Sequence, residues 1–149
     1  MRGDPEDLVR LFSVPGGEHW RYRLAATPNA SLVALEALPD GDLLSLERGH
    51  GLMFLPMIIT VRRVHLDWQA PASMATVTTL ATLDTSEGFS VDNFEGLCRY
   101  RDLEFFMVSD DNFNDLQKTL LVHFALAETG GAAGDGNARD YEPGQKTPD

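Results

Sequence analysis

Short apolar runs interrupted by turn-forming residues constrain the fold of this chain more than any other feature. No segment has apolar residues at positions i, i+3, i+4 and i+7 over three turns, as an amphipathic helix would require. The runs are instead rich in β-branched, leucine and aromatic residues, and Gly, Pro, Asn and Asp separate them. The pattern predicts strands at residues 7–14, 19–25, 31–38, 42–48, 57–66, 76–83, 94–101, 103–109 and 118–126.

Residues 31–48 are predicted to form a β-hairpin, because Pro39-Asp40-Gly41 stands between two of these runs. Proline presets the φ angle of a turn, and glycine takes a positive φ without steric cost. The aspartate side chain can accept a hydrogen bond from the turn backbone. The runs on either side can then pair as antiparallel strands.

Strands at such short spacing predict an antiparallel all-β architecture, which is a sandwich, a barrel or a set of propeller blades. An internal repeat favours blades, because residues 35–47 resemble residues 94–97 followed, after a turn, by residues 106–110. In each unit one acid begins a hairpin and a second acid ends its apolar strand. These acids are Glu36 and Glu47 in the first unit, and Glu95 and Asp110 in the second.

The repeat has a period of about 60 residues, as a propeller blade with long loops would have. We therefore predict a partial β-propeller over residues 1–126, with about two blades plus leading strands. Two blades cannot close into a ring, so the open strand edges predict self-association. Residues 127–149 are rich in Gly, Ala and polar side chains, and we expect them to form a disordered tail.

The charge balance restricts the expected partners. The 12 Lys and Arg residues face 23 Asp and Glu residues, which gives a net charge of −11. Nucleic acids and anionic membranes bind basic patches, so we expect neither as a partner. The longest apolar stretch, residues 51–61, is too short to span a bilayer. The first residues lack an apolar signal-peptide core, and Cys98 is the sole cysteine, so we expect neither a signal peptide in this chain nor an intramolecular disulfide.

Acidic and amide side chains are concentrated in two segments on either side of one predicted hairpin. In a meander, the loop that enters the first strand and the loop that leaves the second open on the same face. They contribute Asp92, Asn93, Glu95, Asp110, Asp111, Asn112 and Asn114. The carboxylates repel one another, which favours either partial protonation or a bound cation. Hard oxygen ligands favour Ca²⁺ or Mg²⁺, with Asp92, Glu95, Asp110 and Asp111 as ligands.

Several of these residues also have a structural interpretation. Asp and Asn in loops between strands commonly accept hydrogen bonds from loop backbone instead of binding metal. Residues 110–121 resemble the opening of an EF-hand loop. Asp115 and Leu121 stand where that loop needs glycine and glutamate, and no predicted helices flank it, so we reject an EF-hand.

The first repeat unit would offer its own polar set on the same face. This set is Asn29, Glu36, Glu47, Arg48 and His50. Glu36 could instead be a half-buried glutamate paired with Arg48, and His50 an exposed loop residue. Cys98 is interpreted as a small core residue. The remaining histidines and the aromatic residues of the second unit are interpreted as structural: His19, His65, His123, Phe94, Phe105, Phe106 and Phe113.

Two motifs carry a family resemblance: VDNFEGL at residues 91–97 and VSDDNFNDLQKTLLVHFAL at residues 108–126. They resemble the phytase-like domain, the family named for the esterase-like activity of phytase. Residues 32–49 and 59–66 resemble neighbouring parts of the same domain. Ala37, Cys98 and Lys118 depart from the family pattern, which favours a glycine, a small aliphatic residue and an arginine at these places.

The resemblance implies a propeller-like repeat fold and hydrolysis of a small phosphoester or phosphodiester, in proteins that are longer, commonly bacterial and exported or periplasmic. Of the matching acidic positions and their arginine, we expect Glu36, Glu47, Arg48 and Glu95 to be catalytic. Arg48 would hold a phosphate oxygen, Glu95 would act as ligand or base, and a divalent cation, Ca²⁺ first, would assist. The alternatives are a non-catalytic Ca²⁺-binding module and an inactive fragment of a longer enzyme.

Overall fold

The fold is known from a computed structural model that describes residues 7–51, 56–113 and 117–127. These ranges contain the strands β1 (Leu8–Phe12), β2 (His19–Arg23), β3 (Ser31–Ala37), β4 (Leu43–His50), β5 (Met57–His65), β6 (Thr76–Asp84), β7 (Phe94–Arg101), β8 (Glu104–Ser109) and β9 (Leu121–Ala125), and one 3₁₀ turn, η2 (Thr85–Glu87). Each predicted strand is confirmed. The largest difference in position is at the start of β9, which is Leu121 and not the predicted residue 118.

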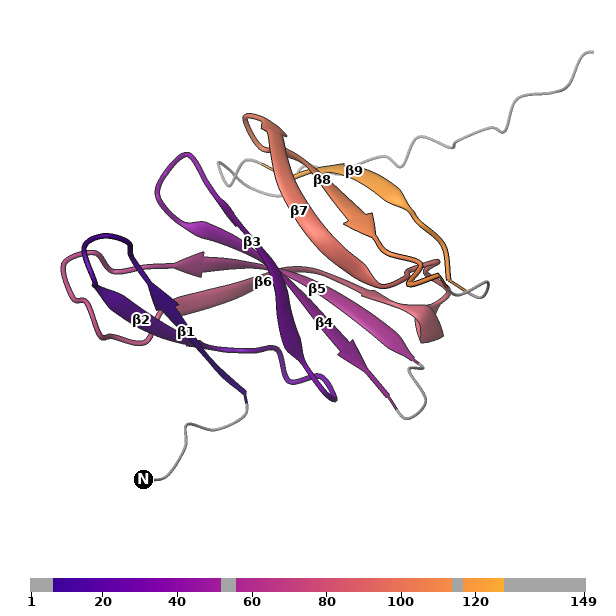
Figure 1. Ribbon diagram of the computed structural model, residues 1–149, viewed down its shortest axis with the longest axis horizontal. Helices are drawn as coiled ribbons and strands as arrows, with labels where there is room; N and C mark the ends of the chain where they lie inside the picture. Colours follow the sequence, from indigo (N-terminus) through magenta and orange to yellow (C-terminus); the bar gives the residue numbers. More distant parts are fainter. Residues whose placement is uncertain (1–6, 52–55, 114–116, 128–149) are drawn as a thin grey trace, which may run out of the picture.

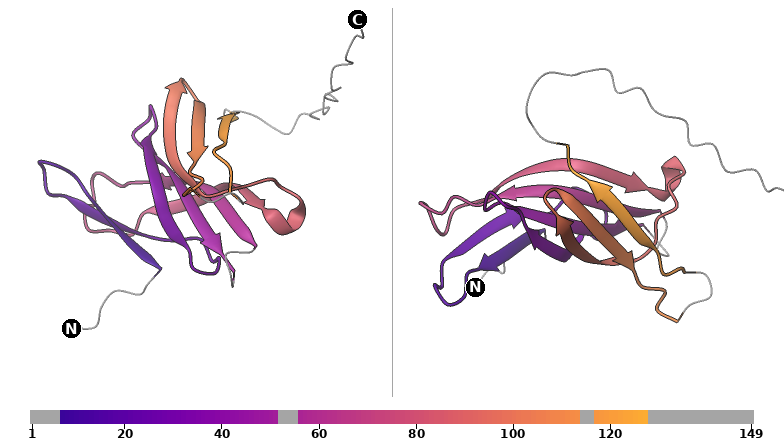
Figure 2. Two further views of the ribbon diagram at one scale, coloured as in Figure 1. Left: turned by 45° about the vertical axis from the view of Figure 1, so that its right-hand side comes forward. Right: turned by 90° about the horizontal axis from the view of Figure 1, so that it is seen from above.

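The strands form three antiparallel sheets in which neighbours along the chain pair with each other. The sheets are the hairpin β1–β2, the four-stranded sheet β3-β4-β5-β6 and the three-stranded sheet β7-β8-β9. Figure 1 shows the four-stranded sheet between the other two, and Figure 2 shows the same succession from other directions. The all-β antiparallel class is therefore confirmed. Propeller blades are not confirmed, because the described strands form three open sheets and no closed ring.

Two apolar clusters hold the three sheets together, one on each face of the four-stranded sheet. Side chains alternate between the faces of a strand, so Leu44 and Leu46 of β4 point to one side and Leu43 to the other. The first cluster joins this sheet to β7–β9: Leu38, Leu44, Leu46, Ile59, Val61, Phe94, Phe105 and Met107. The second joins it to the β1–β2 hairpin: Trp20, Tyr22, Leu24, Val64 and Leu66.

The hairpin predicted from Pro39-Asp40-Gly41 is confirmed by the antiparallel pairing of β3 with β4. Gly41 has a φ of 92°, a value that glycine adopts without strain. The Asp40 Oδ1 atom accepts a hydrogen bond from the backbone N–H of Asp42 at 3.2 Å, as a turn-capping aspartate does.

The residue-by-residue match within the predicted repeat is wrong. Glu36 is the sixth residue of β3 and lies beside the turn, whereas Glu95 is the second residue of β7. The two glutamates therefore lie at opposite ends of their strands. The turns also differ, because residues 38–42 connect the strands of the first hairpin and residues 102–103 those of the second.

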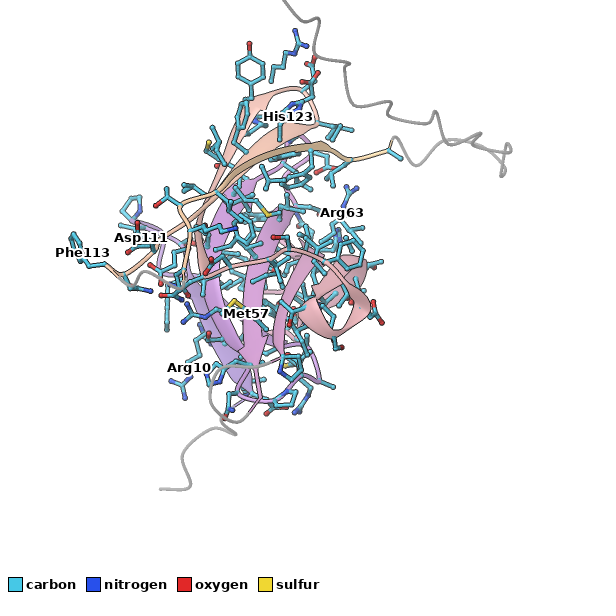
Figure 3. All side chains as sticks on the ribbon, turned by 90° about the vertical axis from the view of Figure 1, so that its right-hand side faces the viewer. Arg10, Met57, Arg63, Asp111, Phe113 and His123 are labelled. Atoms are coloured by element: carbon cyan, nitrogen blue, oxygen red, sulfur yellow. The ribbon has the colours of Figure 1, made fainter. Side chains whose placement is uncertain are left out.

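Two core assignments are also wrong. Cys98 is exposed, because it alternates with the inward-facing Leu97 on β7. Phe113 is fully exposed at a turn with a φ of 56°, and Figure 3 shows it pointing away from the body of the protein. Phe94 and Phe105 are buried as predicted, while Phe106 lies on the outer face of its sheet beside His123.

Three further expectations concern the tail, membrane-spanning segments and the open strand edges. The predicted tail lies outside the described residues, apart from Ala127. The described ranges contain no helix that is long and apolar enough to cross a membrane. Pairing of the open strand edges with another chain stays a prediction.

Candidate functional site

The candidate site lies where the β3 and β7 strands begin. These strands contact each other across the two sheets. The loop before β7 also touches the loop after β8, since the Asp110 N–H donates to the Asn93 carbonyl oxygen at 3.0 Å. The structure therefore brings together the two acidic segments that the sequence analysis placed on one face.

Arg48 and Glu95 meet at the centre of this region. Arg48 lies on β4, on the face that packs against the three-stranded sheet, and its Nη1 donates to Glu95 Oε1 at 3.2 Å. The Arg48 side chain is 25% exposed and that of Glu95 is 46% exposed, so solvent reaches both. Arg48 thus pairs with Glu95 and not with Glu36, which lies near the far end of β3 opposite Leu44.

Asn93 fixes the carboxylate of Glu95. Its side-chain Nδ2 donates to the same oxygen, Glu95 Oε1, at 2.7 Å. Asn93 is 4% exposed, and its own N–H donates to Asp92 Oδ1 at 2.8 Å. Both donors use Oε1, and Glu95 Oε2 has no hydrogen-bond partner within the described part of the chain. Asn93 belongs to the motif at residues 91–97, but its sequence context does not indicate that it orients Glu95.

The loop before β3 is hydrogen-bonded to the end of β4, two positions beyond Arg48. Asn29 has a φ of 50° and donates from Nδ2 to the carbonyl oxygen of His50 at 3.0 Å. The N–H of His50 donates to the Pro28 carbonyl oxygen at 2.9 Å. His50 is therefore the last residue of β4 and half-buried, and not part of an exposed loop.

Gly49 allows this loop to lie against β4. A Cβ atom at residue 49 would come within 2.5 Å of Thr27 Oγ1 and 3.0 Å of the Pro28 carbonyl oxygen. We expect Gly49→Ala to cost about 1–3 kcal/mol of unfolding free energy, because a backbone atom cannot move aside as a side chain can. Urea denaturation measures this loss, and an unchanged midpoint would show that the loop is free to shift.

The carboxylates predicted as metal ligands accept hydrogen bonds from nearby loops. Asp92 Oδ2 accepts from the Lys118 N–H at 2.6 Å. Asp110 Oδ1 accepts from the Asn112 N–H at 3.1 Å, and Asp111 Oδ1 accepts from the Phe113 N–H at 3.0 Å. No group of three or more His, Cys, Asp or Glu side chains is placed to hold a metal ion among the residues described. This arrangement does not fit a preformed cation site, and we derive no chemical step through a cation.

Glu47 lies on the opposite face of β4 from Arg48 and is 1% exposed. Its two carboxylate oxygens each accept from Arg62 Nη1 at 3.2 Å, and Oε2 also accepts from the Ala25 N–H at 2.7 Å. Burial and the neighbouring Glu47 carboxylate raise the pKa of the Tyr22 hydroxyl. The structure thus brings together two of the four predicted catalytic residues, Arg48 and Glu95, and leaves Glu36 and Glu47 elsewhere.

Comparison with protein families gave one finding. Residues 2–113 match the family model for Phytase-like proteins, described as esterase-like activity of phytase. The matched range includes Arg48, Asn93 and Glu95. Neither the curated proteins nor the solved structures gave a match.

Proposed function

The chain belongs to the Phytase-like family, a family of phytase- or esterase-like hydrolases, and from this premise we propose that it hydrolyses a small phosphoester or phosphodiester at the Arg48–Glu95 pair. The observation that carries the proposal is the meeting of these two side chains, from different sheets, at a solvent-exposed position. One is a permanent cation, and the other is a carboxylate whose Oε2 has no hydrogen-bond partner among the described residues. Hydrolysis of a phosphoester needs both an anion-binding group and a proton acceptor.

Arg48 is suited to hold the phosphate. Its guanidinium has five N–H donors, and the contact with Glu95 uses Nη1 alone. The remaining donors can bind two phosphate oxygens in parallel. The charge of the guanidinium then offsets the negative charge that builds up on these oxygens in the transition state.

Glu95 is suited to move the proton. Asn93 and Arg48 hold its Oε1 atom, so Oε2 is left to accept a proton from a water molecule. That water oxygen forms the new bond to phosphorus as the bond to the leaving oxygen breaks. The proton then passes from Glu95 to the leaving oxygen, so the carboxylate is regenerated.

We expect Glu95→Gln to lower the rate of hydrolysis of a chromogenic phosphodiester by about 100-fold, the lower range for loss of a general base. The unfolding free energy should change by less than about 1 kcal/mol, since the Arg48–Glu95 pair is partly exposed. Kinetics and urea denaturation of the same preparation measure the rate of hydrolysis and the unfolding free energy.

Glu104→Gln is the matched control, because Glu104 also accepts from an arginine, Arg101 Nε, at 3.0 Å on the same sheet. It should leave hydrolysis unchanged. Full activity in Glu95→Gln, or an equal loss in Glu104→Gln, would overturn the proposal.

A divalent cation, Ca²⁺ first, stays a prediction. Binding at a hundredfold excess over Kd would stabilise the protein by about 2.7 kcal/mol. Thermal melts with Ca²⁺, with Mg²⁺ and with EDTA test this directly. Equal melting temperatures in all three would overturn the cation prediction and leave the assignment of Arg48 and Glu95 untouched.

A further inference from the structure

We propose that the chain has a second hydrolytic site, for uncharged carboxylic esters with an apolar acyl group, at the other end of the four-stranded sheet. Asp42 and His65 form a hydrogen-bonded pair there, beside an apolar groove. Arg48 pairs with Ile59 near the start of β5, whereas His65 ends this strand, so the two sites are separated by most of its length. Figure 3 shows Arg63, from the second site, well apart from Asp111 of the first.

The pair has the geometry of an oriented general base. His65 Nδ1 lies 2.7 Å from Asp42 Oδ1. An ionised carboxylate can only accept hydrogen bonds, so the imidazole must carry its proton on Nδ1. Nε2 is then the basic nitrogen, and the His65 side chain is 63% exposed while that of Asp42 is only 12% exposed. A buried carboxylate that fixes the tautomer of an exposed histidine is the arrangement that activates water or a hydroxyl in hydrolases.

Arg63 keeps Asp42 ionised and in place. Its Nε donates to Asp42 Oδ2 at 2.5 Å, and its Nη2 forms an ion pair with Asp40. Burial raises the pKa of Asp42, but the hydrogen bonds from Arg63 and His65 outweigh this effect and the pKa is lowered overall. Arg63 Nη1 has no hydrogen-bond partner within the described ranges, so it can donate to a bound ligand.

A groove of about 770 Å³ opens beside Arg63 and Asp40. It lies between β5–β6 and the end of the three-stranded sheet, and Val61, Leu80, Leu103, Phe124 and Leu126 give it mainly apolar walls. This volume is typical of a site for a small ligand. Arg63 lines the groove, and His65 lies two positions further along β5 on the same face. His65 is not itself a lining residue, so the base stands next to the groove-lining Arg63.

The charges beside the groove select the class of ester. Asp40 and Asp42 outnumber the one guanidinium of Arg63, so a phosphate dianion would be repelled. An uncharged ester avoids this repulsion, and its acyl chain can bury apolar surface in the groove.

The reaction balances without a cofactor. His65 Nε2 takes a proton from water while the water oxygen bonds to the ester carbonyl carbon, and the carbonyl electron pair moves to its oxygen. Arg63 Nη1 can donate to this oxyanion. As the tetrahedral intermediate collapses, the bond to the alcohol oxygen breaks and the alcohol takes the proton back from the imidazolium. The products are a carboxylic acid and an alcohol.

The first test is hydrolysis of p-nitrophenyl butyrate by the full chain. We expect His65→Ala to lower kcat/KM by about 100-fold and added imidazole to restore part of it, because imidazole can replace a lost base but not a lost structural contact. His123→Ala is the matched control, since His123 Nε2 also lies 2.9 Å from a carboxylate, that of Glu104, and His123 does not line the groove. No butyrate hydrolysis above buffer, no imidazole rescue, or an equal loss in His123→Ala would overturn the proposal.

The second test concerns the groove. Ala81 lines it, and Ala81→Trp should raise KM for the octanoyl ester at least tenfold more than for the acetyl ester, because only the longer chain needs the groove. Equal effects on both esters would contradict this binding mode. Every variant is also assayed on the phosphodiester: loss of ester hydrolysis alone in His65→Ala supports a separate site, and parallel loss of both activities overturns it.

Discussion

Replacement of Arg62 by methionine should lower the free energy of unfolding by about 3–5 kcal/mol, because it leaves the Glu47 carboxylate buried without its partner. The side chains of Glu47 and Arg62 are 1% and 12% exposed, so water cannot replace the lost contact. Methionine keeps most of the arginine volume, which limits the cavity. Urea denaturation monitored by tryptophan fluorescence measures the change, since Trp20 belongs to the cluster on the same face.

Arg23→Met provides the control. Arg23 pairs with Asp7, but these side chains are 59% and 43% exposed, so its loss should cost less than about 1 kcal/mol. The double variant Glu47→Leu/Arg62→Met should recover part of the loss, because no buried charge remains. Equal losses in Arg62→Met and Arg23→Met would show that the buried pair contributes no more than a surface pair.

The size of this effect follows from what the pair connects. Arg62 Nη1 also donates to the Arg23 carbonyl oxygen at 2.9 Å, and Glu47 accepts from the Ala25 N–H. Both contacts reach the segment that leaves β2. The Glu47–Arg62 pair therefore anchors the β1–β2 hairpin to the four-stranded sheet, and substitution of Arg62 should loosen this attachment.

The strands could be predicted because their signals are local. Apolar runs and turn residues such as Pro39 and Gly41 act within a few positions, and the structure has a strand at each predicted place. The face on which a residue lies was harder to predict. Cys98 stands in an apolar run, and only the packing of β7 against the four-stranded sheet decides that Leu97 points inward and Cys98 outward.

The candidate site could be predicted only in part, because its central contact is not local. Arg48 and Glu95 belong to different sheets, and their meeting depends on how β3 packs against β7. Glu47 matched the same motif as Arg48, but consecutive residues of a strand face opposite sides. A strict alternation of faces along residues 43–50 would have separated the two.

The acidic loops show a second limit of sequence analysis. Asp92, Asp110 and Asp111 are the residue types that bind cations, and they are also the types that cap loop backbone. Both roles use short carboxylates between strands, so composition and spacing do not distinguish them. The pairing of His65 with Asp42 was missed for another reason: it depends on the register of β4 against β5, in which Leu43 lies opposite Val64.

The interface between the two larger sheets should be the most sensitive part of the core. Phe105 on β8 is fully buried, and its ring stacks on Phe124 with centroids 5.5 Å apart. We expect Phe105→Ala to lower the free energy of unfolding by about 3–5 kcal/mol, through lost apolar burial and the cavity left between the sheets. The loss is measured by urea denaturation followed by fluorescence and by circular dichroism.

The neighbouring Phe106 serves as a matched control, because the same substitution there removes a ring from the outer face of the same strand, where Phe106 contacts Tyr100 and His123. Phe106→Ala should lower the free energy of unfolding clearly less than Phe105→Ala does. Since one apolar cluster joins the two sheets, Phe105→Ala should also shift a single cooperative transition and not split it. Two separate transitions would show that β7–β9 folds independently of β3–β6, and the Arg48–Glu95 contact would then join two units that can unfold apart.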